Sequence, residues 1–432
     1  MDNDATMTNT AHDLLAQAKT RFDLTEAADQ ASLYALAEAI LSRPGLTPTD
    51  LQTIARQPDT PLEFKIAAKL VDSRRYLQTL QQPLRLAIVF AMWGEQNRLH
   101  PKSTANPHGE DSLRTKLDQL AWATQGTPID WTLYAVDDGC PHGSGQIAAA
   151  IAAGHPLGQR VRVLFLADAL PTASGPLANL PSANDSRKGG AILYGCQVAL
   201  QDGADAVIYT DADNSVHLGQ IGLLLRPYRQ DNVRVVLGNR KHPDAVLVKQ
   251  EGRWGIGIKV LRHMQRMVGA AIFDLGIRDT QAAFKLYQGD ILAQIIARPT
   301  VYDFSFDTDW LAAVIARGEP VAQVPFAFID SAAESASITQ GPMTTWETLL
   351  MGLVKAVRQR GLPHNEAMAR VLDEEIHSSH DLDLLINHLP PELAQASDAQ
   401  LGDPALMSPA GLQAWIRQRK AEAATENRHD PL

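Results

Sequence analysis

The chain has 432 residues, of which 45% are hydrophobic and 20% charged, and its formal net charge is −10. This composition is that of an ordinary globular protein, and the negative charge argues against nucleic acid or an anionic membrane surface as the main partner. Two cysteines are too few for a disulfide framework. The polar N-terminus lacks a signal-peptide pattern and no apolar run has the length of a transmembrane segment, so we expect a cytoplasmic protein.

Residues 1–82 are expected to form a helical N-terminal region. Apolar residues such as Leu33, Leu36 and Ile40 recur at helical spacing. Thr47 followed by Pro48 is typical of the start of a new helix. The pair Gln82-Pro83 ends this region.

The periodicity changes at Leu84, and residues 83–330 predict an α/β domain. Apolar runs of strand length occupy 84–92, 131–136, 161–167, 206–210 and 233–237, and helical patterns alternate with them at about 111–124, 145–153, 188–202 and 217–229. Continuous apolar strands separated by helices indicate a mostly parallel sheet with helices on both faces. Such sheets bind ligands beyond the carboxyl ends of their strands.

Residues 331–432 are expected to form a helical C-terminal extension with a frayed tail. An apolar stripe on one helix, bounded by Gly361 and Pro363, consists of Trp346, Leu349, Leu350, Leu353, Val354 and Val357. We expect this stripe to pack on the protein's own domain rather than on a bilayer. The last 35 or so residues are rich in Ala, Gln, Asp and Pro, and we expect them to fray.

Charged residues follow several of the predicted strands. Asp137 and Asp138 follow the second strand, and Asp211 and Asp213 follow the fourth. Side chains at i and i+2 of an extended segment point the same way, so Asp211 and Asp213 can share one cation. Their hard oxygens favour Mg²⁺ or Mn²⁺. Lys188, at the start of a helix, adds a cation suited to a phosphate.

Other interpretations of these stretches stay open. A calcium loop beginning at Asp211 is excluded, because Val216 and Gly222 stand where it needs Gly and Glu. An ordinary Asp/Asn turn after the fourth strand, a turn or helix cap at Asp137 and Asp138, and a solvated loop around Lys188 each remain possible alone. Their occurrence together, in this order, indicates a metal-assisted site for a phosphorylated ligand.

Two later segments carry further candidates. "GIRDTQAAFKLY" (276–287) places Asp279, Thr280 and Gln281 before another strand-like run. "FSFDTDWLAAVIARG" (304–318) begins a helix with Asp307 and Asp309. Acidic residues in a first helical turn are commonly partners of the helix dipole. The functional alternative is a base directed into the site.

These stretches together resemble the inverting glycosyltransferase family 2, which has the GT-A nucleotide-sugar-binding fold. "VDDGCPHGSG" is similar to the family's Asp-Asp-Gly-Ser turn, "SRKGGAILYG" to its Asn-x-Gly-Lys-Gly-x-Ala helix start, and "TDADNS" to its Asp-x-Asp. "GNRKH" is similar to Gly-Ser-Arg, and "FDTDWL" to Phe-Asp-Val-Glu-Leu. "DTQAAFKLY" resembles the dolichyl- and polyprenyl-phosphate hexose synthase branch. The resemblance covers about 84–330.

The resemblance implies a role for each matching residue. It assigns the nucleotide to Glu95 and Asp138, the diphosphate to Lys188, and the sugar-diphosphate and metal to Asp211 and Asp213. It assigns an acceptor phosphate to Arg240, the sugar pocket to Asp279 and Gln281, and the general-base position to Asp307. The implied donor is a UDP- or GDP-hexose and the implied cofactor is Mg²⁺ or Mn²⁺.

The acceptor is the least determined part of this prediction. The chain lacks the branch's membrane segments and carries an insertion, "HPKSTANPHGED" (100–111), in its first loop. These features favour a soluble hydroxyl acceptor, whereas the Asp-Thr-Gln stretch favours a polyprenyl phosphate. Two other functions remain as alternatives. A sugar-1-phosphate nucleotidyltransferase would need a glycine-rich, arginine-containing loop directly after the first strand, and the "WGEQNRL" of this chain fits that need poorly. The other alternative is a non-catalytic nucleotide-sugar-sensing module.

Overall fold

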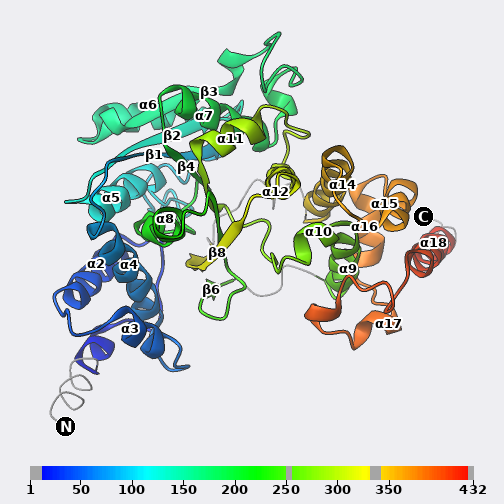
Figure 1. Cartoon of the computed structure of the whole chain (residues 1–432), viewed down its shortest axis with the longest axis horizontal. Helices are drawn as coiled ribbons and strands as arrows, with labels where there is room; N and C mark the ends of the chain where they lie inside the picture. The colour runs from blue at the N-terminus through cyan, green and yellow to red at the C-terminus, as the bar shows by residue number, and fades with distance from the viewer. Residues whose placement is uncertain (1–11, 250–254, 331–341, 427–432) are drawn as a thin grey trace.

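The computed structural model describes residues 12–249, 255–330 and 342–426, and within them a seven-stranded sheet forms the centre of the molecule (Figure 1). The strand order is β3-β2-β1-β4-β7-β5-β8. The strands are β1 (Leu84–Met92), β2 (Ile129–Asp137), β3 (Val161–Phe165), β4 (Ala206–Thr210), β5 (Val235–Asn239), β7 (Phe284–Gln288) and β8 (Val321–Pro325). All neighbouring pairs are parallel except those that β7 forms with β4 and β5. The predicted mostly parallel sheet is confirmed.

Helices cover both faces of this sheet, as the continuous apolar strands predicted. Successive residues of β1 alternate between the two layers: Ala87 and Val89 enter one core, and Ile88 and Phe90 enter the other. The first layer contains α7 (Gly189–Gln201), α11 (Gly289–Ile296) and α12 (Phe306–Ala316). The second contains α5 (Ser112–Thr124), α6 (Ser144–Gly154) and α8 (Ile221–Gln230).

The direction of β7 determines what meets at the ligand-binding edge. Because β7 is antiparallel to β4 and β5, its first residue, Phe284, lies level with Thr210 at the end of β4. The segment just before β7, residues 279–283, therefore joins the carboxyl ends of the other strands. The periodicity of the sequence predicted a strand here but not its direction, because an apolar pattern is the same read from either end.

The N-terminal helices pack against α8 and build a core of their own. They are α2 (Ala27–Leu41), α3 (Pro48–Ala55) and α4 (Leu62–Gln78), shown in blue in Figure 1. The helix start predicted at Thr47 is confirmed, because the Thr47 side chain and Asp50 form a reciprocal capping box. A small parallel sheet of β6 (Val246–Val248) and β9 (Ala327–Ile329) contributes to the same core.

The C-terminal helices pack on the other end of the domain (Figure 1). They are α14 (Pro342–Arg360), α15 (Glu366–Glu375), α16 (Ser379–Ile386), α17 (Pro391–Ala394) and α18 (Pro409–Glu426). Two earlier helices, α9 (Ile258–Val268) and α10 (Ala270–Phe273), lie in the same part of the molecule. The apolar stripe of α14 is buried and α14 packs against α12, so the predicted docking on the protein's own domain is confirmed. No helix among the described residues combines the length and apolar character needed to cross a membrane.

The expected fraying of the last 35 residues is wrong for 409–426. Leu412 and Ile416 of α18 are fully buried, and the helix packs on α15 and α16. These two residues are one helical turn apart, so they form an apolar face that the overall polar composition of the segment concealed. The predicted tail residues 427–432 lie outside the described residues.

Close packing of α14 on α12 requires a glycine at position 352. A Cβ atom placed on Gly352 would collide with the Cβ and Oγ of Ser305. We therefore expect Gly352→Ala to lower the free energy of unfolding by about 1–3 kcal/mol, although Ala normally favours a helix. Urea unfolding measures this, with Gly45→Ala as the control, because a Cβ there meets no atom within 4 Å. Equal stability of the two variants would contradict the predicted close contact.

Candidate functional site

Lys188 connects two strand ends at the carboxyl edge of the sheet. Its backbone N–H donates to Oδ2 of Asp138, just after β2, at 2.7 Å. Its ammonium forms an ion pair with Asp211, just after β4. The Lys188 and Asp211 side chains are 24% and 30% exposed, so a ligand can reach this pair. The structure thus brings together three of the residues that the sequence singled out.

The backbone of Lys188 is held in an unusual conformation. Its φ is +78°, a region that non-glycine residues rarely adopt, so the surrounding contacts must hold it there. The following helix start is partly used within the protein, since the N–H of Gly190 donates to the carbonyl of Tyr302 at 3.0 Å. The side chain of Lys188, more than the helix amides, therefore supplies the positive charge at this point.

Asp138 is buried, and Lys188 engages only one of its two carboxylate oxygens. Its Oδ2 is bound by Lys188, and the nearby Ser186 hydroxyl also stabilises the carboxylate, but Oδ1 makes no hydrogen bond of good geometry within the described residues. Burial raises the pKa of Asp138 to about 6. Since buried polar atoms are nearly always satisfied, Oδ1 is suited to accept a hydrogen bond from a ligand.

Glu95 lies in a buried network of charges. It pairs with Arg98 at 2.9 Å, and Arg98 also contacts Glu110 at 3.2 Å. Glu110 in turn accepts the backbone N–H of Asn214 at 2.8 Å. Burial raises the pKa of Glu95 to about 7, against the opposing effect of Arg98. Glu110 comes from the inserted loop 100–111, so this insertion helps to hold the segment after β4.

The loop that carries Asp211 and Asp213 is held in place by hydrogen bonds to its backbone and within it. The ammonium of the fully buried Lys116 donates to the carbonyl oxygen of Asp213 at 2.5 Å, and Oδ1 of Asp213 accepts the N–H of Ser215 at 3.0 Å. Burial acts to raise the pKa of Asp211, but the adjacent Lys188 outweighs it and the pKa is lowered. Asp211 is therefore an anion already paired with a lysine.

The donor set fits a hard divalent cation with few protein ligands. The two carboxylates offer oxygens of the kind that Mg²⁺ and Mn²⁺ prefer. Within the residues described, no three His, Cys, Asp or Glu side chains are grouped as a metal site. A cation here would thus keep positions for water or for diphosphate oxygens. Asp213 would be the more direct ligand, because Asp211 is engaged by Lys188.

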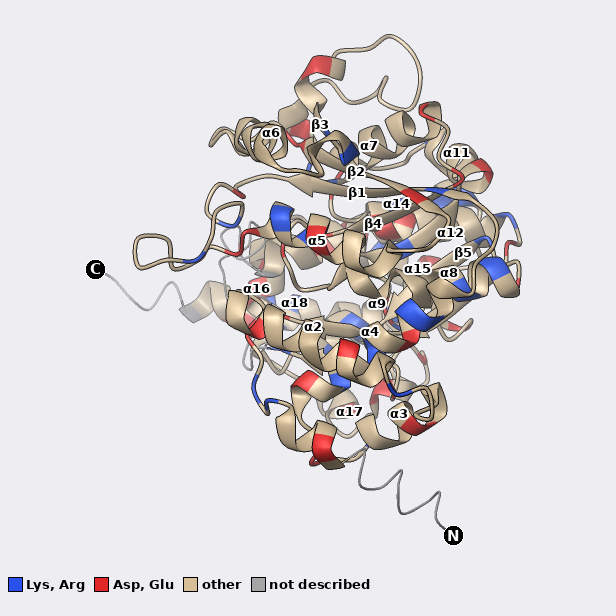
Figure 2. Ribbon diagram, turned by 90° about the vertical axis from the view of Figure 1, so that its left-hand side faces the viewer, with Lys and Arg blue, Asp and Glu red and all other residues tan. Residues whose placement is uncertain are grey.

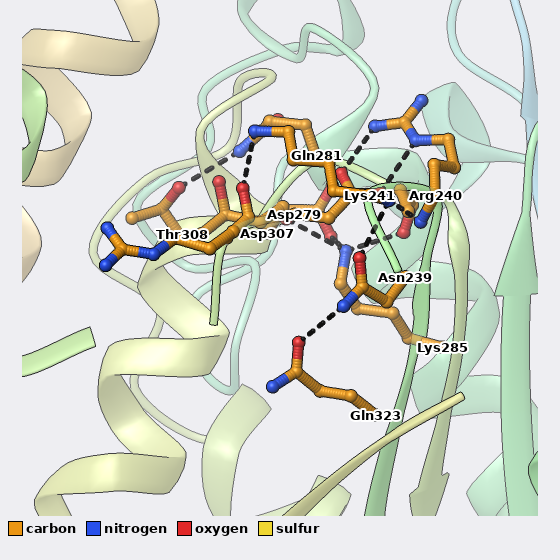
Figure 3. Close-up of polar contacts among 12 residues, drawn as sticks. Asn239, Arg240, Lys241, Asp279, Gln281, Lys285, Asp307, Thr308 and Gln323 are labelled. Carbon is orange, nitrogen blue, oxygen red and sulfur yellow. Dashed lines mark hydrogen bonds and ion pairs between the residues drawn. The ribbon is translucent and has the colours of Figure 1, made fainter. Parts of the chain in front are cut away.

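Arg240 and Asp279 form a two-point ion pair beside this edge (Figure 3). Nε and Nη2 of Arg240 donate to Asp279 at 2.9 and 2.7 Å, and the backbone N–H of Arg240 donates to it at 2.8 Å. The Arg240 guanidinium also lies 4.9 Å from the ring centroid of Phe328. This geometry fixes the arginine and compensates its charge.

Asp307 is held by a lysine that sequence reasoning did not identify. The ammonium of Lys285 donates to Oδ1 of Asp307 at 2.9 Å (Figure 3). The same ammonium donates to the Tyr209 hydroxyl at 2.8 Å. It also donates to two carbonyl oxygens before β7, at 3.0 and 2.7 Å. Burial raises the pKa of Asp307 and lowers that of Lys285. A fully buried lysine in an apolar strand is rare, and its presence in "AFKLY" was the available signal.

The two remaining candidates, Gln281 and Asp309, take different positions. Gln281 donates to the Thr308 hydroxyl at 3.0 Å, so it lies beside the start of α12. Asp309 is fully buried and pairs with Arg360 of α14 at 2.9 Å, which makes it a packing residue rather than part of the site. Asp307 lies two residues before Asp309 in α12. In contrast to Asp309, it is close enough to Lys188 for their charges to interact.

Comparison with known proteins gives a curated protein and several solved structures that are similar to this chain. No family model matches the chain. The chain is 25% identical over 182 residues to undecaprenyl-phosphate mannosyltransferase of Micrococcus luteus, a match that covers 39% of this chain and 72% of that protein. This match is to a sugar transferase that uses a polyprenyl phosphate, as its name states. The resemblance predicted from its motifs is thereby confirmed.

Solved structures of sugar transferases are also similar to this chain. Mannosyl-3-phosphoglycerate synthase from Rubrobacter xylanophilus is 16% identical, with a TM-score of 0.43 over 67% of this chain and 78% of that one. Glucosyl-3-phosphoglycerate synthase from Mycobacterium tuberculosis, solved with Mn²⁺, UDP-glucose and phosphoglyceric acid, is 14% identical, with a TM-score of 0.44 over 68% of this chain and 85% of that one.

Proposed function

We propose that this protein is an inverting, metal-dependent glycosyltransferase that moves a hexose from a nucleoside diphosphate sugar to a hydroxyl group of a soluble acceptor. The observation that carries the proposal is the position of Lys188. Its ammonium and backbone join Asp211 and Asp138 at the edge where α/β sheets bind ligands. A cation between two acidic strand ends suits a diphosphate that links a nucleoside to a sugar.

Different residues at this edge contact different parts of the proposed donor. Asp138, through its Oδ1, accepts a hydrogen bond from the nucleoside, and Lys188 meets the diphosphate. Asp213, with Asp211 beside it, would hold a divalent cation, which would supply positive charge against the leaving diphosphate. Because Lys188 and Lys116 hold the loop in place before the donor arrives, little rearrangement is needed.

The proposed acceptor is a hydroxyl compound because of the charges around Asp307. A hydroxyl loses a proton as the new bond forms, and a carboxylate whose pKa is raised by burial is a stronger base than an exposed carboxylate. Lys285 fixes Oδ1 of Asp307 and leaves the second oxygen for the acceptor. Arg240, the residue for an acceptor phosphate, donates three hydrogen bonds to Asp279, whereas the Lys188 ammonium donates only one to Asp211.

A polyprenyl phosphate is the second candidate acceptor. The curated relative from Micrococcus luteus is named for such an acceptor. Two exposed lysines, Lys241 and Lys249, lie within electrostatic range of Asp279 and would supply extra positive charge for a phosphate. A phosphate acceptor is already ionised, so it would need these cations and no base.

The donor half is tested by sugar release and transfer from labelled UDP- and GDP-hexoses. We expect turnover in Mn²⁺ or Mg²⁺ that stops with a chelator and returns when the metal is restored. Asp213→Ala should lose this metal-dependent turnover while its thermal unfolding without metal stays near that of the parent protein. Full activity in the chelator would contradict the metal-dependent mechanism. Formation of a nucleotide sugar from sugar 1-phosphate would indicate the nucleotidyltransferase alternative.

The acceptor half is tested by comparing two variants, with donor binding measured separately by calorimetry. If the acceptor is a hydroxyl, Asp307→Asn should slow turnover about 10²- to 10⁴-fold through loss of the base, and donor affinity should change little. Arg240→Ala should have the smaller effect on turnover. The reverse order, with Asp307→Asn near normal and Arg240→Ala inactive, would favour the polyprenyl phosphate acceptor.

A further inference from the structure

A second cavity lies away from the catalytic edge, between the N-terminal helices and the sheet domain. It has a volume of about 650 Å³ and is enclosed by α3, α4, α8, residues 243–248 and the end of β8. This volume is in the range of small-molecule sites in proteins. Its walls combine apolar side chains, among them Leu51 and Leu223, with several charged groups. The cavity can thus take both a charged group and a short carbon skeleton.

Two of the cations in this cavity are already compensated. Arg56 pairs with Asp244 at 2.6 Å, and Arg226 pairs with Asp72 at 2.7 Å. Asp244 also accepts a hydrogen bond from Gln52 at 2.6 Å. These two pairs use both carboxylates that line the cavity, so no acidic side chain in its lining remains for another cation.

Lys65 and Lys69 are the surplus charges. Both lie on α4 and line the cavity, one helical turn apart and on the same face. Within the described part of the chain, neither ammonium forms an ion pair or donates a hydrogen bond. Figure 2 shows basic segments on adjacent parts of α4 and α8. Lys69 lies within electrostatic range of all four members of the two ion pairs, and its burial lowers its pKa. Like charges at this spacing oppose folding, so an anion between them would stabilise the arrangement.

We propose that this cavity is a binding site for a small organic phosphate, with Lys65 and Lys69 holding its dianionic phosphate and the apolar wall of α3 and α8 contacting its carbon skeleton. Two uncompensated lysines match the two charges of a phosphate monoester. The site is separate from the diphosphate site at Lys188 and does not depend on the proposed reaction. Its occupant would join the N-terminal helices to the segment 243–248, which continues from Arg240.

The test is calorimetric titration with glycerol 3-phosphate, inorganic phosphate and, as the neutral comparison, glycerol, without divalent cations. We expect glycerol 3-phosphate to bind the parent protein more tightly than inorganic phosphate does, and glycerol to show no binding. The double variant Lys65→Met/Lys69→Met should bind at least tenfold more weakly. Lys355→Met, which removes an exposed lysine of α14, and Lys188→Ala should bind like the parent.

Thermal unfolding separates a binding role from a structural one. Because the two lysines repel each other, the double variant should unfold at the same or a higher temperature than the parent, while losing the phosphate-induced rise in that temperature. A lower unfolding temperature would mean that the lysines serve the fold, and would overturn the proposal. It would also be overturned by binding that survives in the double variant but is lost in Lys188→Ala, or by no binding at millimolar ligand.

Discussion

The ion pair between Lys188 and Asp211 is the interaction on which the rest of the site depends. It spans the gap between the end of β4 and the start of α7, while the backbone of Lys188 reaches Asp138 after β2. Neither carboxylate is fully exposed, so each would be costly to leave uncompensated. The strained φ of Lys188 indicates that this position is held by its surroundings rather than by local preference.

Buried charges behind the edge supply that support. Lys116 binds the carbonyl of Asp213, and Lys285 binds Asp307. Each of these lysines is fully buried and satisfied by more than one electrostatic partner. Buried charges of this kind are weak evidence for stability, since an apolar pair is often as stable. They do fix the positions of the groups they bind, which is what preorganised electrostatic catalysis requires.

Much of the fold followed from apolar runs and their boundaries. The predicted strands 84–92 and 206–210 have the same bounds as β1 and β4, because each is an apolar run of strand length that is buried apart from Arg85 and Ala91. The predicted run 161–167 is longer than β3, because its last two residues, Leu166 and Ala167, belong to a short 3-10 helix instead. The antiparallel direction of β7 was not predictable, because apolar periodicity carries no direction. Packing of α18 was hidden by the polar residues around Leu412 and Ile416.

The candidate site was predictable only where charged residues directly follow strands. Asp138, Asp211 and Asp213 were identified in this way, and Lys188 by its place before a helix. Lys116 and Lys285 were missed because their partners lie 97 and 22 residues away along the chain. No local sequence pattern predicts a contact between residues that far apart along the chain.

The most direct test of this account is the effect of Lys188→Ala on two ligands measured by calorimetry in Mn²⁺. A nucleoside diphosphate should bind about 10- to 100-fold more weakly, as expected for a lost charge-assisted hydrogen bond, whereas the free nucleoside should bind almost as before. The neighbouring exposed cation gives the control, so Arg187→Ala should leave both affinities unchanged. Equal losses for nucleoside and diphosphate in Lys188→Ala, or no loss for either, would contradict the placement of the diphosphate at Lys188.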